Sequence, residues 1–346
     1  MTFSASVIGA SGFTGGELLR ILCDHPELEI SQVTSRKYSG RSIGYTHPNL
    51  RDLKLKYSSP DELDPVDVLF TATPHGVSMN QIDDFSEAAD LVVDLSADFR
   101  LKDPKKYDEY YQGHSRPELL NQAVYGLPEI HREDLKSATL IACGGCNSTV
   151  TLLGLYPLFQ TGILTAKDTI VADIKVGASE GGASGSTSSH HAVRSGIVRP
   201  YAPTGHRHEA EIEQEIGAKV AFTVHAVDMI RGASATCHIF PNEPNLTKPM
   251  IWKAYRESYQ NEPFVNLLSG SGGNYRYPEP KVVAGTNNVE IAFEIDKRNN
   301  RLVVFSAIDN MMKGSAGQAI HATNIALGLD ETMGLAYRSL HPTGSP

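Results

Sequence analysis

Cysteine is scarce in this sequence, and long hydrophobic runs are absent from it. The chain has 346 residues and four cysteines, which is too few for the disulfide framework of a secreted protein, so we expect its thiols to stay reduced. No apolar run approaches the ~18 residues that a membrane-spanning helix needs. The opening residues, MTFSASVIGASG, carry no basic leader. We therefore expect no signal peptide and a cytoplasmic protein.

Positive charge is also in short supply. Lys and Arg number 31 against 40 Asp and Glu, which gives a net charge of -9. A nucleic-acid-binding protein would usually present a basic face, so this balance argues against that class. The hydrophobic fraction of 40% is ordinary for a soluble globular protein, and the length suggests two domains. We see no internal repeat or heptad pattern.

Strand and helix signals alternate over the first 147 residues. Strands are expected at residues 4–8, 28–34, 67–72, 91–95 and 138–142, with a helix at 17–22. Such alternation predicts a parallel sheet with helices on both faces. The sequence thus predicts an α/β fold class with a Rossmann-type domain over residues 1–147.

The character of the chain changes after about residue 148. Longer, β-branched strands are expected at residues 169–176, 219–227, 233–240, 289–296 and 301–308. They predict a second, α+β domain with a larger mixed sheet over residues 148–313, followed by a C-terminal helix within 314–346 that returns to the first domain. The Gly/Ser/His-rich stretch 177–205 is too long for an ordinary turn, so we expect a functional or mobile loop there.

A glycine-rich turn follows the first expected strand and precedes the first helix. It reads Gly9, Ala10, Ser11, Gly12, Phe13, Thr14, Gly15. Glycines let the backbone approach a pyrophosphate, and the helix N-terminus offers N–H groups to the anion. The motif alone is weak, because a turn that merely packs would look the same. Its place between strand and helix favours a dinucleotide site.

The second expected strand ends in Thr34, Ser35, Arg36 and Lys37. An NAD site usually places an acidic residue here for the ribose 2′-hydroxyl. Hydroxyls and two cations suit a 2′-phosphate instead, so we expect NADP as the cofactor. A solvated basic turn is the alternative.

Cys146 is the candidate nucleophile. It follows a buried strand and two glycines, and the apolar residues after it have helical spacing. The positive end of a helix dipole favours the thiolate, and the same N–H groups can hold an oxyanion during acyl transfer. Cysteine is also often a small buried hydrophobe. In addition, Cys143 and Cys146 form a C-x-x-C, which could be a redox pair or half of a zinc site. Cys23 and Cys237 are isolated, so we expect no metal site.

The segment His206-Arg207-His208 enters an expected helix. A cysteine nucleophile needs a proton acceptor, and histidine is the usual one. Either His206 or His208 could serve, and Arg207 could hold a phosphate or carboxylate. From residue 175 to 208 four Lys/Arg and four His face one acidic residue, Glu180. This locally basic stretch suits an anionic substrate, although a solvated loop would look similar.

Several motifs in order resemble the N-acetyl-gamma-glutamyl-phosphate reductase family over essentially the whole chain. They are GASGFTGGELLR near the start, LVVDLSADFR at 91–100, VYGLPEI at 124–130, LYPL at 155–158, GHRHEAEIEQE at 205–215 and KGSAGQAIHATN at 313–324. The resemblance implies an NADPH-dependent reductase that turns an acyl phosphate into a semialdehyde through a thioester on Cys146. It implies His208 as acid/base, with His206 as the alternative, and NADP contacts that include Asn310. It also implies a homo-oligomer, a dimer or tetramer.

Two departures from the bacterial arginine enzymes matter. Those enzymes usually show Gly-Cys-Tyr-Pro-Thr, whereas this chain has Gly-Cys-Asn-Ser-Thr, and it carries Arg194 and Arg199 ahead of the histidines. Both features are similar to the branch whose substrate rides on LysW, an acidic amino-group carrier protein, in lysine and arginine biosynthesis. The expected substrate is therefore LysW-aminoadipyl phosphate, with LysW-glutamyl phosphate as a second one, and Arg194, Arg199 and Arg207 are expected to bind substrate or carrier.

Three rival functions stay open at this point. The first is ordinary N-acetyl-gamma-glutamyl-phosphate reduction in arginine biosynthesis. The second is aspartate-semialdehyde dehydrogenase, which shares the chemistry but takes a smaller substrate; the HRH segment and the basic stretch weigh against it. The third is a non-catalytic NADP-binding redox sensor that uses a reversible Cys143–Cys146 disulfide.

Overall fold

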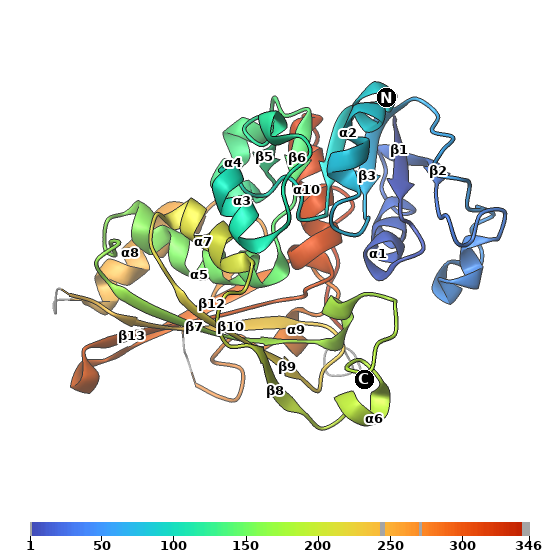
Figure 1. The fold of residues 1–346 in the computed structure, drawn as a ribbon. Helices are drawn as coiled ribbons and strands as arrows, with labels where there is room; N and C mark the ends of the chain where they lie inside the picture. Colours follow the sequence, from blue (N-terminus) through green and yellow to red (C-terminus); the bar gives the residue numbers. More distant parts are fainter. Residues whose placement is uncertain (1, 243–245, 270–271, 341–346) are drawn as a thin grey trace. The chain divides into compact units, whose positions relative to one another are not determined.

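The computed structural model describes residues 2–242, 246–269 and 272–340, which divide into two compact units (Figure 1). The first unit holds the described residues up to Gly144 together with Ser315–Ala336. The second holds Gly145–Gly314 and the described residues from Tyr337 on. No helix in these residues is long and apolar enough to cross a membrane.

The first unit is a parallel sheet with its connecting helices. Its elements are β1 (Phe3–Ile8), α1 (Phe13–Leu22), β2 (Leu28–Val33), η1 (Ile43–Tyr45), η2 (Pro48–Leu50), β3 (Val66–Thr71), α2 (Ser78–Ala88), β4 (Ala89–Asp94), α3 (Pro104–Tyr110), η3 (Pro117–Leu119), β5 (Val124–Tyr125), α4 (Pro128–Leu135), β6 (Leu140–Ala142) and α10 (Gly317–Ala326). All strand pairs are parallel, in the order β2-β1-β3-β4-β6-β5. The order reverses between β1 and β3, so right-handed crossovers place α1 and α2 on opposite faces. The C-terminal helix α10 packs against α4 and α1.

The second unit is built on a mixed sheet of longer strands. Its elements are α5 (Cys146–Gln160), β7 (Thr169–Val176), η4 (Ala178–Gly181), α6 (His191–Arg194), β8 (Val198–Ala202), α7 (His208–Ile216), β9 (Ala221–Val227), β10 (Ala233–Phe240), α8 (Lys248–Tyr259), β11 (Val265–Leu267), α9 (Pro280–Val283), β12 (Val289–Asp296), η5 (Lys297–Asn299) and β13 (Arg301–Ile308); the π-helix η6 (Met312–Ala316) leads out of it. The strand order is β11-β12-β13-β10-β7-β9-β8.

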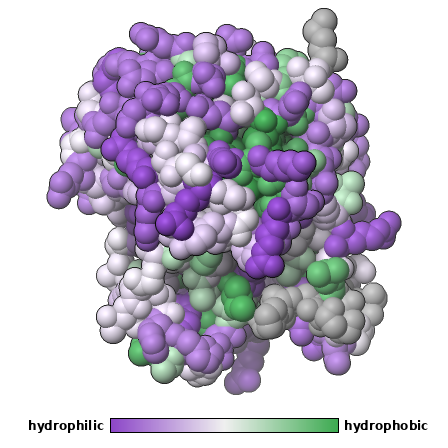
Figure 2. Space-filling model, turned by 90° about the vertical axis from the view of Figure 1, so that its right-hand side faces the viewer, coloured by the Kyte–Doolittle hydropathy of each residue, from purple (hydrophilic) through white to green (hydrophobic). Residues whose placement is uncertain are grey.

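Burial alternates along the central strands of this sheet, because one face meets the core. In β7 and β10 every second residue is buried. Helix α5 packs on β10 and β13 and is flanked by α7 and α8 (Figure 1). Most of α5 is buried, including the polar residues of its first half, as expected of a helix enclosed by a sheet and two other helices. On the face of the molecule that Figure 2 shows, most side chains are hydrophilic.

The predicted fold class is confirmed: a parallel Rossmann-type sheet, a mixed-sheet second unit and a C-terminal helix on the first unit. Residues 177–205 differ from the expected loop, since they contain α6 and β8. Strand β8 lies at the edge of the sheet and contains Pro200. An edge strand tolerates proline, but a proline in a sequence argues against a strand, so the pattern did not predict β8. The last helix begins at Gly317, within the expected range 314–346, because residues 312–316 form the π-helix.

Candidate active site

A cavity of ≈ 570 Å³ opens in the first unit where β1 and β3 end. Open α/β sheets bind dinucleotides at such a point, because the connections leave neighbouring strands in opposite directions and open a crevice. The predicted cofactor residues Gly9, Ser11, Thr34, Ser35 and Arg36 all line the cavity, together with Lys37. Ala10, Gly12, Phe13 and Thr14 belong to the same turn but are not part of the lining.

The geometry of the turn suits a phosphate-bearing dinucleotide. Gly9 has a φ of 77°, and a Cβ there would lie 2.5 Å from the Ala72 carbonyl oxygen, so glycine is required. The Ser11 and Ser35 hydroxyls lie 2.8 Å apart and join the turn to the end of β2. Arg36 faces Asp61 at 3.5 Å, and both side chains are exposed. Such a pair contributes little, so the guanidinium remains available to an anion.

The segment before the nucleophile is fixed within the first unit. Arg100, the last residue of the LVVDLSADFR motif, donates from Nε to the Cys143 carbonyl at 2.7 Å. The Cys143 N–H donates to the Asp94 carbonyl at 2.8 Å. The Gly144 N–H donates to Oε1 of Gln318 at 2.7 Å. These bonds fix the backbone that follows β6 as far as Gly144, the residue before the second unit begins.

Cys146 is the first residue of α5 in the second unit, with Gly145 as its N-cap. Its side chain is partly exposed, whereas the following residues are buried. A Cβ on Gly314 would lie 2.6 Å from the Cys146 Cβ, so this glycine leaves room for the nucleophile. A thiol here faces the N–H groups of the first helical turn, which favour negative charge on sulfur and on an attacked carbonyl oxygen.

Cys143 has the opposite environment, although it is three residues away. Its side chain is 1% exposed. Burial, with a smaller effect of the nearby Asp94 carboxylate, raises the pKa of the Cys143 thiol far above its ordinary value. All four cysteines are thiols in the structure. Cys143 is therefore an unreactive core residue, and the two cysteines are not equivalent.

His208 lies against the backbone that precedes Cys146. It begins α7, is 3% exposed, and a Cβ on Gly145 would lie 2.3 Å from its Nε2. Glu211, one turn further along α7, accepts from the Gly145 N–H at 2.9 Å and the Ser148 hydroxyl at 2.8 Å. Its other carboxylate oxygen lies 3.8 Å from Nε2 of His208. This buried carboxylate ties the histidine to the start of α5 and can stabilise an imidazolium.

His206 lies beside His208 but in a different role. Its Nδ1 accepts the His208 N–H at 3.1 Å, and the two rings lie 4.5 Å apart, edge to face. Burial, with the neighbouring Arg207 charge, lowers the pKa of His206 to about 4. His206 is therefore neutral at pH 7 and holds the first residue of α7 in place.

A hydrogen-bonded chain leads away from the thiol. The Cys146 Sγ lies 3.6 Å from Oδ1 of Asn147, which is fully buried. The Asn147 amide donates to Oε1 of Glu180 at 3.4 Å, and the Tyr201 hydroxyl donates to the same oxygen at 2.8 Å. Burial raises the pKa of Glu180, and the Tyr201 hydroxyl and the Arg207 charge partly offset this. Asn147 is the residue that departs from the bacterial Gly-Cys-Tyr pattern.

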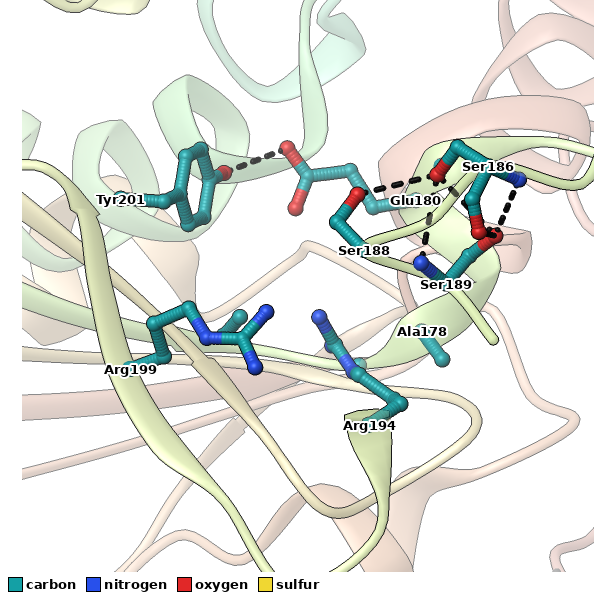
Figure 3. A pocket seen from close by; sticks show the side chains of 11 residues that line it. Ala178, Glu180, Ser186, Ser188, Ser189, Arg194, Arg199 and Tyr201 are labelled. Carbon is teal, nitrogen blue, oxygen red and sulfur yellow. Dashed lines mark hydrogen bonds between the residues drawn. The ribbon is translucent and has the colours of Figure 1, made fainter. Parts of the chain in front are cut away.

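Glu180 and Tyr201 form one wall of a second cavity, of ≈ 280 Å³, within the second unit (Figure 3). The predicted anion-binding residues Arg194 and Arg199 line it, whereas Arg207 is not part of the lining. Their guanidinium groups point toward one another. Ser186, Ser188 and Ser189 complete the wall and bond to each other.

The sequence alone did not identify several residues of this site. They are Gly145, Glu180, Tyr201, Glu211 and Gly314. Only Glu211 carried a readable signal, since it stands three residues after His208 on one helix face. Asn310, which is expected to contact the cofactor, lies in the second unit. Its Oδ1 accepts the Gly232 N–H at 2.7 Å, and its Nδ2 donates to the Ser179 hydroxyl at 2.9 Å. Its cofactor role stays a prediction.

Comparison with known proteins places this arrangement in a family. Residues 4–138 match the family described as "Semialdehyde dehydrogenase, NAD binding domain", and residues 146–310 match "Semialdehyde dehydrogenase, dimerisation domain". Aspartate semialdehyde dehydrogenase with NADP from Candida albicans is similar in fold, with a TM-score of 0.65 at 17% identity over 94% of this chain and 98% of that chain.

Curated relatives are much more similar in sequence. One from Haloarcula marismortui, named LysW-L-2-aminoadipate/LysW-L-glutamate phosphate reductase, is 64% identical over 100% of both chains. One from Thermomicrobium roseum, named LysW-L-2-aminoadipate 6-phosphate reductase, is 49% identical over 99% of this chain and all of the relative. The predicted resemblance is confirmed. The chain belongs to the semialdehyde dehydrogenase family of NAD(P)-dependent oxidoreductases, in the group formed by these curated reductases.

Proposed function

We propose that the protein reduces the acyl phosphate of LysW-linked 2-aminoadipate, and of LysW-linked glutamate, to the semialdehyde in lysine and arginine biosynthesis, with NADPH as reductant. The observation that carries this proposal is the partly exposed Cys146 at the start of α5, with His208 on one side and a cation-lined cavity on the other. The names of relatives at 64% and 49% identity support the substrate.

The first half of the reaction is acyl transfer to sulfur. His208 accepts the thiol proton, and Glu211 stabilises the resulting imidazolium. The Cys146 thiolate then attacks the acyl carbon. A C–S bond forms, the C–O bond to phosphate breaks, and phosphate leaves with that electron pair and with the proton that His208 holds, which returns the imidazole to its neutral form. The N–H groups at the start of α5 stabilise the oxyanion of the tetrahedral intermediate.

The second half is reduction. NADPH, when bound, supplies the hydride that takes the thioester to the level of the aldehyde. The hemithioacetal oxyanion then lies within the same group of helix N–H donors. Its C–S bond breaks, the electron pair returns to sulfur as the carbonyl forms, and the semialdehyde leaves. Sulfur ends as the thiolate that began the cycle, so one residue serves both halves.

NADP rather than NAD is the cofactor that this lining favours. Thr34, Ser35 and Arg36 end β2 beside the cavity, and Lys37 follows them. Hydroxyls and cations can bind a 2′-phosphate, whereas the acidic residue that would select the ribose hydroxyl is missing from this position. A protein of similar fold, the aspartate semialdehyde dehydrogenase from Candida albicans, is solved with NADP.

A carrier protein is the proposed partner, and a second copy of the chain is another. An acidic carrier would meet the cations of residues 175–208, and Arg194, Arg199 and Arg207 are the proposed contacts for substrate or carrier. The description of residues 146–310 as a dimerisation domain supports a homo-oligomer built through the second unit.

Oxidation of NADPH with matched substrates tests the proposal. We expect turnover with aminoadipyl phosphate on LysW, and a kcat/KM at least about 100-fold lower for free N-acetylglutamyl phosphate, because the free substrate lacks the carrier contacts. Comparable turnover of the free acetylated substrate would make the protein an ordinary N-acetyl-gamma-glutamyl-phosphate reductase. Cofactor binding without turnover of either would favour a redox sensor.

A further inference from the structure

The cavity in the second unit holds two like charges. The one carboxylate of its lining, Glu180, forms no ion pair with either of them, although the Arg194 charge acts on Glu180 electrostatically. Arg194 donates from Nη2 to the Val176 carbonyl at 3.1 Å, and Arg199 from Nη2 to the Val193 carbonyl at 2.9 Å. Each guanidinium is thereby fixed by the backbone while it keeps other N–H groups for a ligand. Figure 3 shows both groups directed into the same space.

No carboxylate in the described residues forms an ion pair with either arginine, and Nε of Arg194 is buried without a hydrogen-bond partner. Two facing cations repel one another, and a buried donor without an acceptor is costly. An oxyanion between the guanidinium groups would remove both penalties, and carboxylate geometry matches the guanidinium fork.

Glu180 does not fill this role. It is the one carboxylate in the cavity lining, but its Oε1 already accepts from the Tyr201 hydroxyl and the Asn147 amide. The serine hydroxyls of the lining are likewise engaged with one another. The unused binding capacity of the cavity is therefore cationic.

A single side chain, that of Asn147, links the lining of the cavity to the reacting sulfur. The Asn147 side chain stands between the Cys146 Sγ and Glu180, and it contacts both. A leaving phosphate stays beside the carbonyl carbon that Cys146 attacks. An anion bound beyond Asn147 therefore suits the other end of the substrate, a short methylene chain away.

We propose that Arg194 and Arg199 form a carboxylate subsite that binds the α-carboxylate of the carrier-linked amino acid. The inference rests on the proposed function, in which carbon 2 bears this carboxylate and the carrier is joined to the neighbouring nitrogen. The enzyme then recognises the amino-acid chain directly and does not rely on the carrier alone.

The test compares two carrier-linked substrates that differ only in this group. One is LysW-linked 2-aminoadipyl phosphate; the other is LysW-linked 5-aminopentanoyl phosphate, which lacks the α-carboxylate. We expect the wild-type protein to show a KM about 30- to 100-fold higher for the second, as expected when a charged hydrogen-bonding group is lost. We expect the R194Q/R199Q variant to show nearly equal KM values for the two substrates.

The comparison is internal to each protein, so partial misfolding of a variant does not imitate the result. Arg298→Gln, on an exposed turn of the same unit, is the matched control and should discriminate like the wild type. The R194K/R199K variant keeps the two positive charges but loses the planar guanidinium groups that bind a carboxylate through two hydrogen bonds. The ratio of its KM values for the two substrates should therefore be intermediate.

Two outcomes would overturn the inference while leaving the proposed function intact. One is equal KM values for both substrates in the wild-type protein. The other is a loss in R194Q/R199Q that is the same for both substrates, which would assign these arginines to the phosphate or to the carrier surface. If the wild-type protein reduces neither substrate, the proposed function itself fails.

Discussion

The two cavities are built in different ways. The first-unit cavity is formed largely by three short, contiguous segments, one after β1, one at the end of β2 and one that runs from the end of β3 into α2, and its shape depends on glycine backbone. The second-unit site joins the start of α5, the segment around Glu180, the edge strand β8 and the start of α7. A dinucleotide site can therefore be read from local sequence, whereas the reactive site depends on the pairing of distant segments.

The difference has a chemical counterpart. In the proposed cofactor site of the first unit, backbone N–H groups and exposed cations would bind the ligand, so we expect many side chains there to be replaceable at moderate cost. In the proposed reactive site of the second unit, single side chains would hold protons or form bonds, and each has a defined neighbour. Substitutions in the second unit should therefore reduce turnover far more than substitutions in the first.

The largest effect is expected at the nucleophile. Cys146→Ala should lower kcat for reduction of the LysW-linked substrate by at least about 10⁴-fold, because it removes the atom that carries the acyl group. Cys143→Ala is the matched control: it should keep kcat within a few-fold and lower the free energy of unfolding by about 1–2 kcal/mol through lost packing. Full activity in the Cys146 variant would refute the thioester route.

The next effect separates the two histidines. His208→Asn should lower kcat about 10²- to 10⁴-fold, as expected for loss of a general acid/base. His206→Asn should lower it about tenfold or less, because the His206 ring positions the start of α7 through a backbone N–H and ring contacts and takes no proton in the proposed reaction. Steady-state rates of both variants, with NADPH affinity measured separately, check the assignment. A larger loss in the His206 variant would exchange the two roles.

A smaller effect is expected in the first unit. Arg36→Gln should raise the KM for NADPH roughly tenfold and leave the KM for NADH nearly unchanged, because only NADPH carries the 2′-phosphate. Arg51→Gln, another exposed arginine of the first unit outside the cavity, serves as the control. Equal losses for both cofactors would show that Arg36 acts on something other than the 2′-phosphate.

The smallest effect concerns stability against pH. The pKa of His206 is lowered to about 4, below the ordinary value of about 6.5. The folded state thus binds fewer protons than the unfolded state between these pH values. The stabilisation is fully present above pH 6.5 and is lost as the pH falls toward 4. Between pH 6.5 and 4.5, the free energy of unfolding of the His206→Asn variant, measured with urea, should fall by about 2 kcal/mol less than that of the wild type. Parallel curves for the two proteins would contradict the shifted pKa.

Much of the fold could be predicted from the sequence, and the reasons are local. Strands 169–176, 233–240, 289–296 and 301–308 match β7, β10, β12 and β13 residue for residue, because β-branched alternation marks half-buried strands. The short strands β5 and β11 and the proline-containing β8 carry too few residues or too weak a pattern. Pairing with neighbouring strands stabilises them: β11 and β8 pair with the longer β12 and β9, and β5 pairs with the short β6. Sequence periodicity does not record such pairing.

Only part of the site could be suggested from the sequence. Cys146, the two histidines and the glycine turn stand in contiguous motifs, so spacing alone suggested them. Glu180 and Tyr201 are 21 residues apart and meet through a side-chain hydrogen bond. The space that Gly314 leaves for Cys146 is visible only after folding. Such relations depend on tertiary contacts, which no local pattern encodes.

Acyl transfer to Cys146 in the absence of NADPH tests the central claim most directly. The protein is mixed with LysW-linked 2-aminoadipyl phosphate, and released phosphate and the mass of the chain are followed together. We predict about one equivalent of phosphate per active site and a matching mass increase that fragmentation assigns to Cys146 rather than Cys143. Phosphate release without acylation of Cys146, or an adduct on Cys143, would contradict the account.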